Sequence, residues 1–257
     1  MTPEAKDLCE GIAAKGRDRA FLIAFEGPDG SGKTTQRKLF KDWLTSEGVD
    51  VVATRWSSSP LIKPVIKARK QARSLDPQEF SLLHAADFRH RMDTEVLPAL
   101  AAGKTVVADR FLFTALARDA ARGLDLDWLL HLYSPLYWPD IVFYFAVSPE
   151  TSGKRIAATR VPKYYEAGQD ITNIDDPFES YQNFVKRVIA EYEALSVIFH
   201  FIKVDAEKPI HEQHILIRQL FTESRSRPWP RWNEEAIADW LESRTDSVKT
   251  RVAGDGD

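Results

Sequence analysis

Cysteine is nearly absent from this chain, with a single residue, Cys9, among 257. One cysteine forms no internal disulfide, so a disulfide-stapled scaffold is excluded and a reducing compartment is indicated. No apolar run approaches the roughly 20 residues that a membrane-spanning helix needs. Residues 1–20 lack the apolar core of a signal peptide. We therefore expect a soluble, cytoplasmic protein.

An excess of positive charge is also absent. Lysine and arginine number 35 against 38 aspartates and glutamates, which gives a net charge of -3. A chain without a global basic field does not attract nucleic acid or an anionic membrane surface. We expect neither as a partner, and an anionic small molecule would have to be held by arginines placed locally.

What the chain does contain is a series of short apolar runs rich in β-branched and aromatic residues. They are Phe21–Phe25, Val49–Trp56, Thr105–Asp109, Ile141–Val147 and Phe199–Asp205. Such runs are typical of strands buried on both faces of a parallel sheet. Stretches with helical spacing lie between them, at Lys33–Glu47, Pro77–Ala102, Phe113–Arg122 and Asp176–Ile198. The alternation predicts an α/β fold with helices on both faces of the sheet, whose ligands bind beyond the carboxyl ends of the strands.

Two segments stand apart from this alternation. Residues 159–177 are polar and contain glycine and proline, so we expect a mobile loop that acts as a lid. Residues 224–257 carry three of the seven tryptophans, and Asn233 is the expected N-cap of a short helix there. The expected organisation is a leader over 1–20, one domain over 21–223, and a Trp-rich extension over 224–257 that packs back on the body.

The stretch GPDGSGKT, from Gly27 to Thr34, matches the phosphate-binding pattern G-x-x-x-x-G-K-[ST] at every fixed position. A strand-like run precedes it and an amphipathic helical pattern follows, as the motif requires. Its glycines let backbone N–H groups surround phosphate oxygens at a helix N-terminus. We expect Lys33 to reach the terminal phosphates and the Thr34 hydroxyl to bind Mg2+. The predicted ATP-binding residues are Gly27, Asp29, Gly30, Ser31, Gly32, Lys33, Thr34 and Thr35.

Further features favour a kinase over a switch GTPase or a motor ATPase. Asp109 and Arg110 end a predicted strand, where a carboxylate suits Mg2+ and a guanidinium binds phosphate. Arg55 ends another strand at the same expected edge. Arg155 and Arg160 lie near the lid, and a basic flap excludes water and neutralises charge during phosphoryl transfer. The N-K-x-D guanine signature is missing.

With these motifs in this order, the chain resembles the thymidylate kinase family of nucleoside monophosphate kinases from about Phe21 to Phe221. The segments that carry the resemblance are FEGPDGSGKTTQ, ATRW, LLHAADFRHRMDTEVLPALAAGKTVVADRF, TALA, and RIAATR followed by KYYE. The resemblance implies the P-loop kinase fold, with a five-stranded parallel sheet and a small lid. It also implies ATP and Mg2+, phosphoryl transfer to a nucleoside monophosphate, with dTMP to dTDP expected first, and a possible homodimer.

The resemblance assigns roles residue by residue. Asp29 matches a carboxylate at the acceptor's sugar and phosphate end, and Arg110 matches the arginine that holds the acceptor phosphate. Asp109 accompanies the metal with Thr34, and Arg55 resembles the arginine of the family's T-R-E-P segment. The lid arginines resemble those that clamp the donor. The predicted catalytic residues are Lys33, Asp29, Arg110, Arg155 and Arg160.

The segment that would recognise the base departs from the family. The family's L-F-A-A-D-R supplies a phenylalanine that stacks on thymine and an arginine that binds its edge, whereas LHAADF puts His84 and Phe88 there. The family's Tyr-Gln pair becomes Arg118-Asp119. A site loses its discrimination when the polar partners of its ligand are removed. The predicted acceptor-binding residues are Asp29, Arg55, His84, Phe88, Arg110 and Arg118.

Alternatives remain open at this point. The acceptor is dTMP, or the chain is a kinase of the same fold that acts on a different nucleotide, a nucleoside or a metabolite. A third interpretation is a non-catalytic nucleotide-binding module whose Trp-rich tail contacts a partner. His84 and Phe88 are equally compatible with plain core packing, since buried aromatic residues on helices are common.

Overall fold

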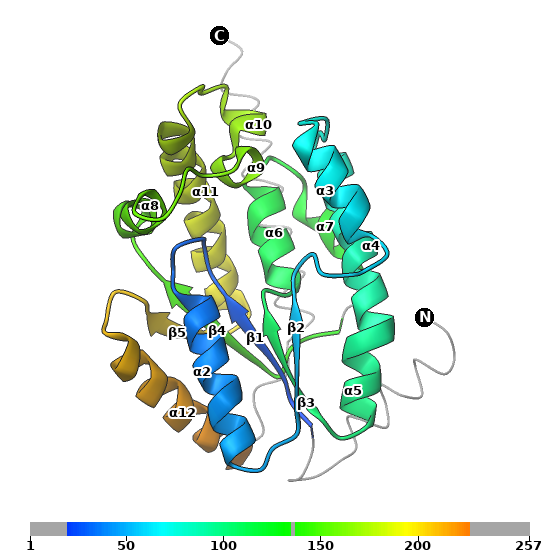
Figure 1. The fold of residues 1–257 in the computed structure, drawn as a ribbon, viewed down its shortest axis with the longest axis vertical. Coiled ribbons are helices and arrows are strands. Elements are labelled where there is room, and N and C mark those ends of the chain that lie inside the picture. Colours follow the sequence, from blue (N-terminus) through cyan, green and yellow to red (C-terminus); the bar gives the residue numbers. More distant parts are fainter. Residues whose placement is uncertain (1–19, 135–136, 227–257) are drawn as a thin grey trace.

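The structure is a computed structural model that describes residues 20–134 and 137–226, with side chains up to Ser224. Five parallel strands form one sheet in the order β2-β3-β1-β4-β5, which confirms the predicted fold class (Figure 1). The strands are β1 (Leu22–Glu26), β2 (Val51–Arg55), β3 (Thr105–Asp109), β4 (Ile141–Ala146) and β5 (Ile202–Asp205). The register places Phe25 and Arg55 opposite Asp109, so the carboxyl ends of three strands meet at one edge.

Helices connect these strands and cover both faces of the sheet. They are α2 (Lys33–Ser46), α3 (Lys63–Gln71), α4 (Pro77–Arg91), α5 (Leu97–Ala101), α6 (Leu112–Ala120), α7 (Leu126–Tyr133), α8 (Pro149–Ala157), α9 (Tyr164–Ala167), α10 (Gln169–Thr172), α11 (Pro177–Ile198) and α12 (Ile210–Ser226). A π-helical turn, η1 (Met92–Val96), joins α4 to α5. The helix predicted over Pro77–Ala102 is therefore continuous, except that its backbone hydrogen bonds follow the π-helical pattern in this turn. Among the described residues, no helix is long and apolar enough to cross a membrane.

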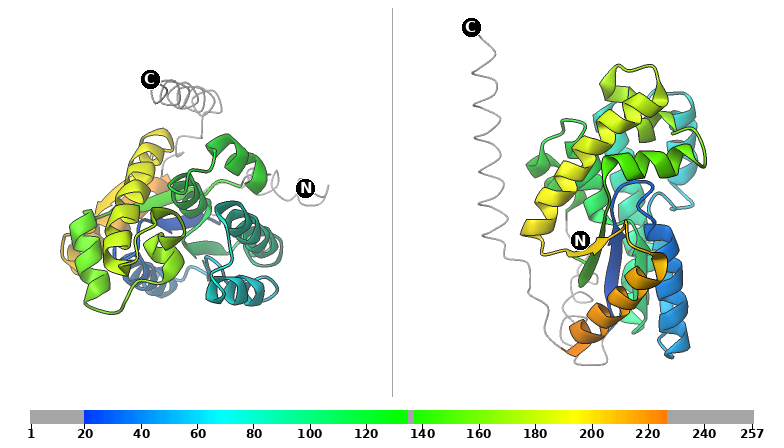
Figure 2. Two further views of the ribbon diagram at one scale, coloured as in Figure 1. Left: turned by 90° about the horizontal axis from the view of Figure 1, so that it is seen from above. Right: turned by 90° about the vertical axis from the view of Figure 1, so that its left-hand side faces the viewer.

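The side chains of β1 alternate between two cores. Ile23 and Phe25 pack with residues of α2 and α12, whereas Leu22 and Ala24 pack with residues of α4, α6 and α11. Figure 2 shows the sheet between these two layers of helices. Because β1 is central and buried on both faces, the loop that follows it starts from a fixed position.

Three sequence-based expectations need correction. The outer strands β2 and β5 are only half-buried, because each lies at an edge of the sheet. Residues 159–177 contain the short helices α9 and α10 rather than loop alone. Helix α12 continues to Ser226, so the proposed boundary after residue 223 falls inside a helix. Asn233 and the rest of the Trp-rich extension, like the leader up to residue 19, lie outside the described residues.

A buried carboxylate at the end of β1 holds the start of α6. Glu26 Oε1 accepts hydrogen bonds from the backbone N–H groups of Phe111 at 2.7 Å and Thr114 at 3.2 Å. Its Oε2 accepts from the Thr114 hydroxyl at 2.6 Å and from the Tyr192 hydroxyl of α11 at 2.9 Å. Helix α6 has no capping side chain of its own, so Glu26 satisfies N-terminal donors that would otherwise be unpaired. It thereby fixes α6 and α11 relative to β1.

Replacing Glu26 by glutamine tests this bond network. The amide nitrogen of glutamine cannot accept, so buried donors lose their partner, and we expect Glu26→Gln to lower the free energy of unfolding by about 1–3 kcal/mol. The exposed Glu223 of α12 provides the matched control, and Glu223→Gln should change the value by less than about 0.5 kcal/mol. Urea unfolding measures both, and equal effects of the two substitutions would contradict the assignment.

Candidate active site

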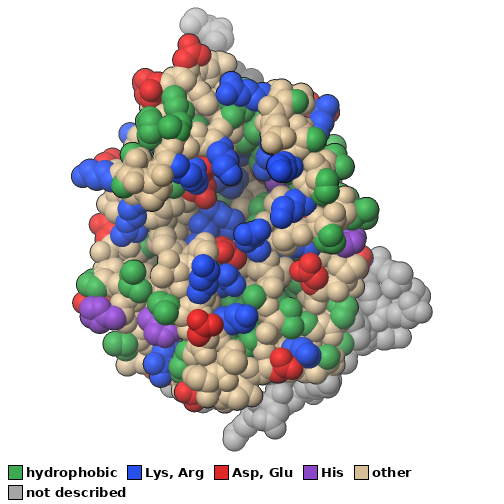
Figure 3. Space-filling view, in the orientation of Figure 1, with side chains coloured by type: hydrophobic (Ala, Val, Ile, Leu, Met, Phe, Trp, Pro, Cys, Tyr) green, Lys and Arg blue, Asp and Glu red, His purple; other side chains and the backbone are tan. Residues whose placement is uncertain are grey.

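A cavity of about 1100 Å³ opens at the carboxyl edge of the sheet. Its walls come from the phosphate-binding loop Gly27–Thr34 (the P-loop), the end of β2, α3, α4, α6 and the segment around α9. Ten lining side chains are lysine or arginine and five are aspartate or glutamate. Figure 3 shows the hollow with lysines and arginines around it. The charge of the cavity therefore favours an anionic ligand although the net charge of the chain is negative.

The P-loop backbone depends on its glycines. Gly30 and Gly32 have φ angles of 74° and 83°, in the left-handed region. A Cβ atom on Gly30 would lie 2.8 Å from the carbonyl oxygen of Ser152 on α8, whereas one on Gly32 would meet nothing within 4 Å. Both positions therefore favour glycine because of their positive φ. Gly30 has the additional requirement that a side chain would clash with α8, whereas Gly32 does not.

Lys33 and Ser31 present polar groups to the loop. Lys33 is the first residue of α2 and is nearly buried, and its Nζ donates to the Pro28 carbonyl at 2.9 Å. Burial, assisted by the charge of Arg110, lowers the pKa of Lys33 to about 8. The Ser31 hydroxyl is buried and has no hydrogen-bond partner among the described residues. A phosphate would give both groups an acceptor.

Two oxygen ligands suited to Mg2+ lie together beside the P-loop. The Thr34 hydroxyl donates to Asp109 Oδ2 at 3.0 Å. Arg37 on α2 places its Nε 3.5 Å from the same carboxylate oxygen. Mg2+ is commonly bound through one or two protein oxygens together with substrate phosphates. The hydroxyl and carboxylate therefore fit the metal that the motif implies.

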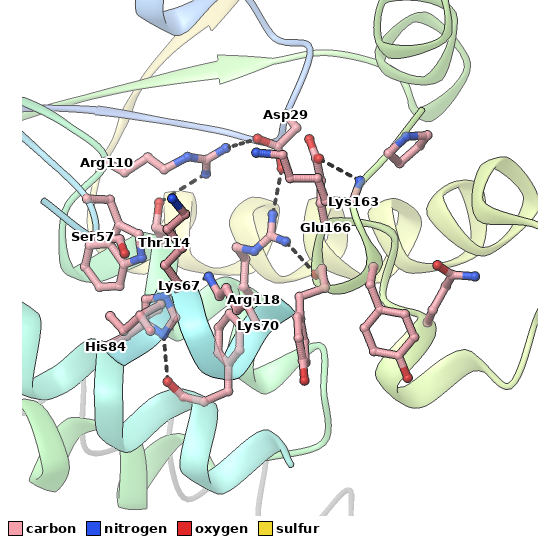
Figure 4. Close-up of a pocket in the computed structure, with 18 of the residues that line it drawn as sticks. Asp29, Ser57, Lys67, Lys70, His84, Arg110, Thr114, Arg118, Lys163 and Glu166 are labelled. Atoms are coloured by element: carbon pink, nitrogen blue, oxygen red, sulfur yellow. Dashed lines mark hydrogen bonds and ion pairs between the residues drawn. The ribbon is translucent and has the colours of Figure 1, made fainter. Parts of the chain in front are cut away.

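Asp29 forms ion pairs with two arginines. Its Oδ1 lies 2.7 Å from Arg110 and its Oδ2 lies 2.8 Å from Arg118, as Figure 4 shows. Although burial opposes ionisation, these guanidiniums hold the pKa of Asp29 well below its usual range. Arg110 has a φ of 68°, and a non-glycine residue in this region is uncommon and is concentrated at functional sites.

The two predicted lid arginines have different environments. Arg160 lines the cavity and forms an ion pair with Glu166 at 2.5 Å. Arg155 instead lies on α8 and donates to the carbonyls of Gly30 at 3.1 Å and Ala206 at 2.9 Å. Arg155 is not among the residues that line the cavity. Its guanidinium thus supports the P-loop backbone, and its predicted clamp on the donor stays a prediction.

His84 and Phe88, at the positions that distinguish the chain from the family pattern, are both buried. His84 lines the cavity, but its ring stacks between Phe80, with centroids 4.2 Å apart, and Trp56, at 5.9 Å. Phe88 packs on Phe111 in the core and does not line the cavity. The prediction that Phe88 contacts the acceptor is corrected to core packing. His84 has no free face on which a base could stack.

Most of the predicted polar residues meet at this cavity. Those that line it are Asp29, Lys33, Thr34, Arg55, His84, Asp109, Arg110, Arg118 and Arg160. The sequence analysis did not identify Glu26, which fixes α6 and α11 relative to β1. It also did not identify the lysines of α3. The spacing of Lys63, Lys67 and Lys70, at i, i+4 and i+7, was the available signal for one cationic helix face.

Comparison with known proteins agrees with this geometry. Residues 25–217 match the family model described as thymidylate kinase. The chain is 40% identical over 207 residues to "Probable thymidylate kinase 2" of Saccharolobus solfataricus, covering 80% of this chain and 97% of the relative. It is 29% identical over 200 residues to the "Thymidylate kinase" of Geobacillus thermodenitrificans, covering 75% and 85% respectively.

The chain belongs to the thymidylate kinase family. Thymidylate kinases are nucleoside monophosphate kinases, and the protein is an enzyme of that class, using ATP and a nucleotide acceptor. Membership agrees with a cavity lined by Lys33, Thr34, Arg110 and Arg118, residue types that suit phosphate groups.

Gly30 and Gly32 of the P-loop make a matched pair for a stability test. Gly32→Ala should destabilise by about 1–2 kcal/mol, because alanine disfavours the left-handed region. Gly30→Ala carries that cost and a clash with the Ser152 carbonyl, so we expect at least about 1 kcal/mol more. Thermal unfolding without nucleotide compares them. A Gly32→Ala effect as large as that of Gly30→Ala would show that the contact with α8 is unimportant.

Proposed function

We propose that this enzyme transfers the γ-phosphoryl group of ATP to dTMP and produces dTDP. The observation that carries the proposal is that Lys33 of the P-loop lines one cavity together with Arg110 and Arg118, so that one cavity holds cations for both the donor and the acceptor. The names of the relatives support dTMP as the acceptor. A homodimer remains an expectation from the resemblance alone.

Lys33 and Thr34 act on the donor in this proposal. The Lys33 ammonium neutralises charge on the transferring group, with Ser31 and the loop backbone completing the phosphate contacts. Thr34 and Asp109 would hold Mg2+, which neutralises and orients the donor phosphates when bound. Arg160 is released from Glu166 to contact phosphate when the lid closes.

Arg110 and Arg118 act on the acceptor. Asp29 holds the two guanidiniums close together at one end of the cavity, where they bind the acceptor phosphate, and Arg55 adds a third cation at the end of β2. Positioning and electrostatics supply most of the rate, because phosphoryl transfer needs little covalent help from the protein.

A different nucleoside monophosphate is the second candidate acceptor. The observation that favours it is the burial of His84 and Phe88, which leaves neither a stacking ring nor an arginine where the family pattern has them. ADP release with MgATP and each nucleoside monophosphate in turn distinguishes the two candidates. Preference for dTMP supports the first, and preference for a purine nucleotide supports the second.

Lys33→Met tests the donor side. Methionine keeps most of the buried volume but removes the ammonium, so we expect kcat to fall by about 10²- to 10³-fold with little change in thermal unfolding. Lys38→Met is the control, because Lys38 lies exposed on the same helix. Near-normal turnover by Lys33→Met would refute the donor role of the P-loop.

Arg110→Met tests the acceptor side. Loss of this guanidinium should raise KM for the acceptor by about 10- to 100-fold, as expected for a charged hydrogen bond, while KM for ATP changes little. Arg187→Met, on an exposed position of α11, serves as the control. Unchanged acceptor KM, or an equal effect on ATP, would overturn the assigned role.

A further inference from the structure

Helix α3 presents a cationic face to the cavity that the phosphate-binding roles do not use. Lys63, Lys67 and Lys70 all line the cavity. Lys70 is the most enclosed of the three, and no carboxylate of the described residues lies within ion-pair distance of it. Enclosing an ammonium is costly, and the charged groups that act on Lys70 are three cations against the single carboxylate of Asp119. Its position therefore suits a ligand that accepts its hydrogen bonds.

His84 fixes Lys70 through a defined tautomer. His84 Nδ1 lies 2.7 Å from the Phe80 carbonyl, which only accepts, so the Nδ1 atom carries the ring proton. The Nε2 atom is then an acceptor, and Lys70 Nζ donates to it at 3.1 Å. Stacking between Phe80 and Trp56 holds the imidazole in place. Two of the three N–H bonds of Lys70 remain for a ligand.

Lys70 lies beside Arg118, on the side of the cavity away from Asp29 and Arg110. Its Nζ is 4.5 Å from the centroid of the Phe80 ring, and Figure 4 shows it between His84 and Arg118. The walls near it are aromatic, whereas Asp29 and Arg110 mark the other end. A cavity with a phosphate site at one end and aromatic walls with a hydrogen-bond donor at the other suits a nucleotide whose base carries a carbonyl.

We propose that Lys70, held by His84, donates a hydrogen bond to the 4-oxo group of the acceptor's pyrimidine. The assignment rests on the proposed function. In a pyrimidine nucleotide, C4 lies across the ring from the N1 atom that bears the sugar, so its substituent points away from the phosphate. An ammonium only donates, and therefore it binds a 4-oxo group and repels the 4-amino group of cytosine. Lys70 thus selects thymine or uracil over cytosine.

Steady-state kinetics with dTMP, dUMP and dCMP test this assignment. For Lys70→Met we expect kcat/KM to fall about 10- to 100-fold with dTMP and dUMP, to stay level or rise with dCMP, and KM for ATP to stay within about twofold. Lys70→Arg, which keeps charged donors, should retain part of the 4-oxo preference. Lys186→Met, exposed on α11 and outside the cavity, should match the unsubstituted enzyme in all three acceptors.

A pH profile separates hydrogen bonding from structural support. Burial, with the nearby cations Arg118, Arg122 and Lys163, lowers the pKa of Lys70 to about 7, while Asp119 acts in the opposite sense. Lys67 on α3 also lines the cavity. Because the ammonium exists below this pKa, the ratio of kcat/KM for dTMP to that for dCMP should decline as pH rises through about 7. The ratio cancels titrations shared by both acceptors, and Lys70→Arg should abolish the decline.

The outcomes separate this inference from the proposed function. Turnover of dTMP with the same dTMP-to-dCMP ratio in Lys70→Met and the unsubstituted enzyme overturns the role of Lys70 alone. A pH-independent ratio in the unsubstituted enzyme also overturns it. Absence of ADP release with every nucleoside monophosphate overturns the proposed function and the inference with it. Circular dichroism confirms that each variant is folded, and Lys70→Arg provides the readout if Lys70→Met unfolds.

Discussion

The buried carboxylate of Glu26 is the constraint on which the geometry of the site depends. Glu26 ends β1, and the P-loop begins at the next residue, so whatever Glu26 holds is fixed relative to the phosphate-binding loop. It holds the first turn of α6 through Phe111 and Thr114, and it holds α11 through Tyr192. The end of β1, α6 and α11 are therefore joined by one side chain with four hydrogen bonds.

This constraint also explains the unusual backbone of Arg110. The residue lies between the last residue of β3 and the start of α6, and both neighbours are fixed, one by the sheet and one by Glu26. Its N–H donates to the Phe25 carbonyl at 3.0 Å, and its φ of 68° turns the chain from strand to helix. A strained conformation persists where the surroundings determine it. The benefit is that the guanidinium meets Asp29 and the Gly27 carbonyl.

Asp29 reduces the repulsion between Arg110 and Arg118. Arg110 and Arg118 would repel one another if no anion lay between them, and the carboxylate lets both stay ordered at short range. In the proposed function, the acceptor phosphate shares these guanidiniums with Asp29. The enzyme therefore carries a preorganised cationic pair and avoids the cost of bringing two like charges together during binding.

The sequence was sufficient for features that depend on local pattern. The apolar runs predicted the five strands, and the P-loop motif predicted a glycine-rich loop between β1 and α2. It was insufficient where the contact joins distant segments. Glu26 lies 85 residues from Phe111 in the sequence, so the local sequence around either residue does not predict their hydrogen bond. Arg155 was predicted to clamp the donor, and its neighbours in the sequence do not indicate that α8 directs its guanidinium to the carbonyls of Gly30 and Ala206.

The segment that would recognise the base also depends on a contact between distant residues, His84 and Lys70. The sequence reveals that the stacking ring and the arginine of the family pattern are replaced, but it does not reveal what takes over, because Lys70 comes from a helix that carries no motif. The structure couples the two changes. Histidine at position 84 supplies the acceptor nitrogen that a phenylalanine lacks, and an enclosed lysine needs such an acceptor. His84 holds Lys70 by one hydrogen bond, and the other N–H groups of the ammonium stay available to a ligand. In this assignment Lys70 of α3 supplies the hydrogen-bond donor that the family pattern takes from an arginine on α4. Loss of a motif residue is thus weak evidence for loss of a specificity when a neighbouring helix presents the same hydrogen-bonding capacity to the cavity.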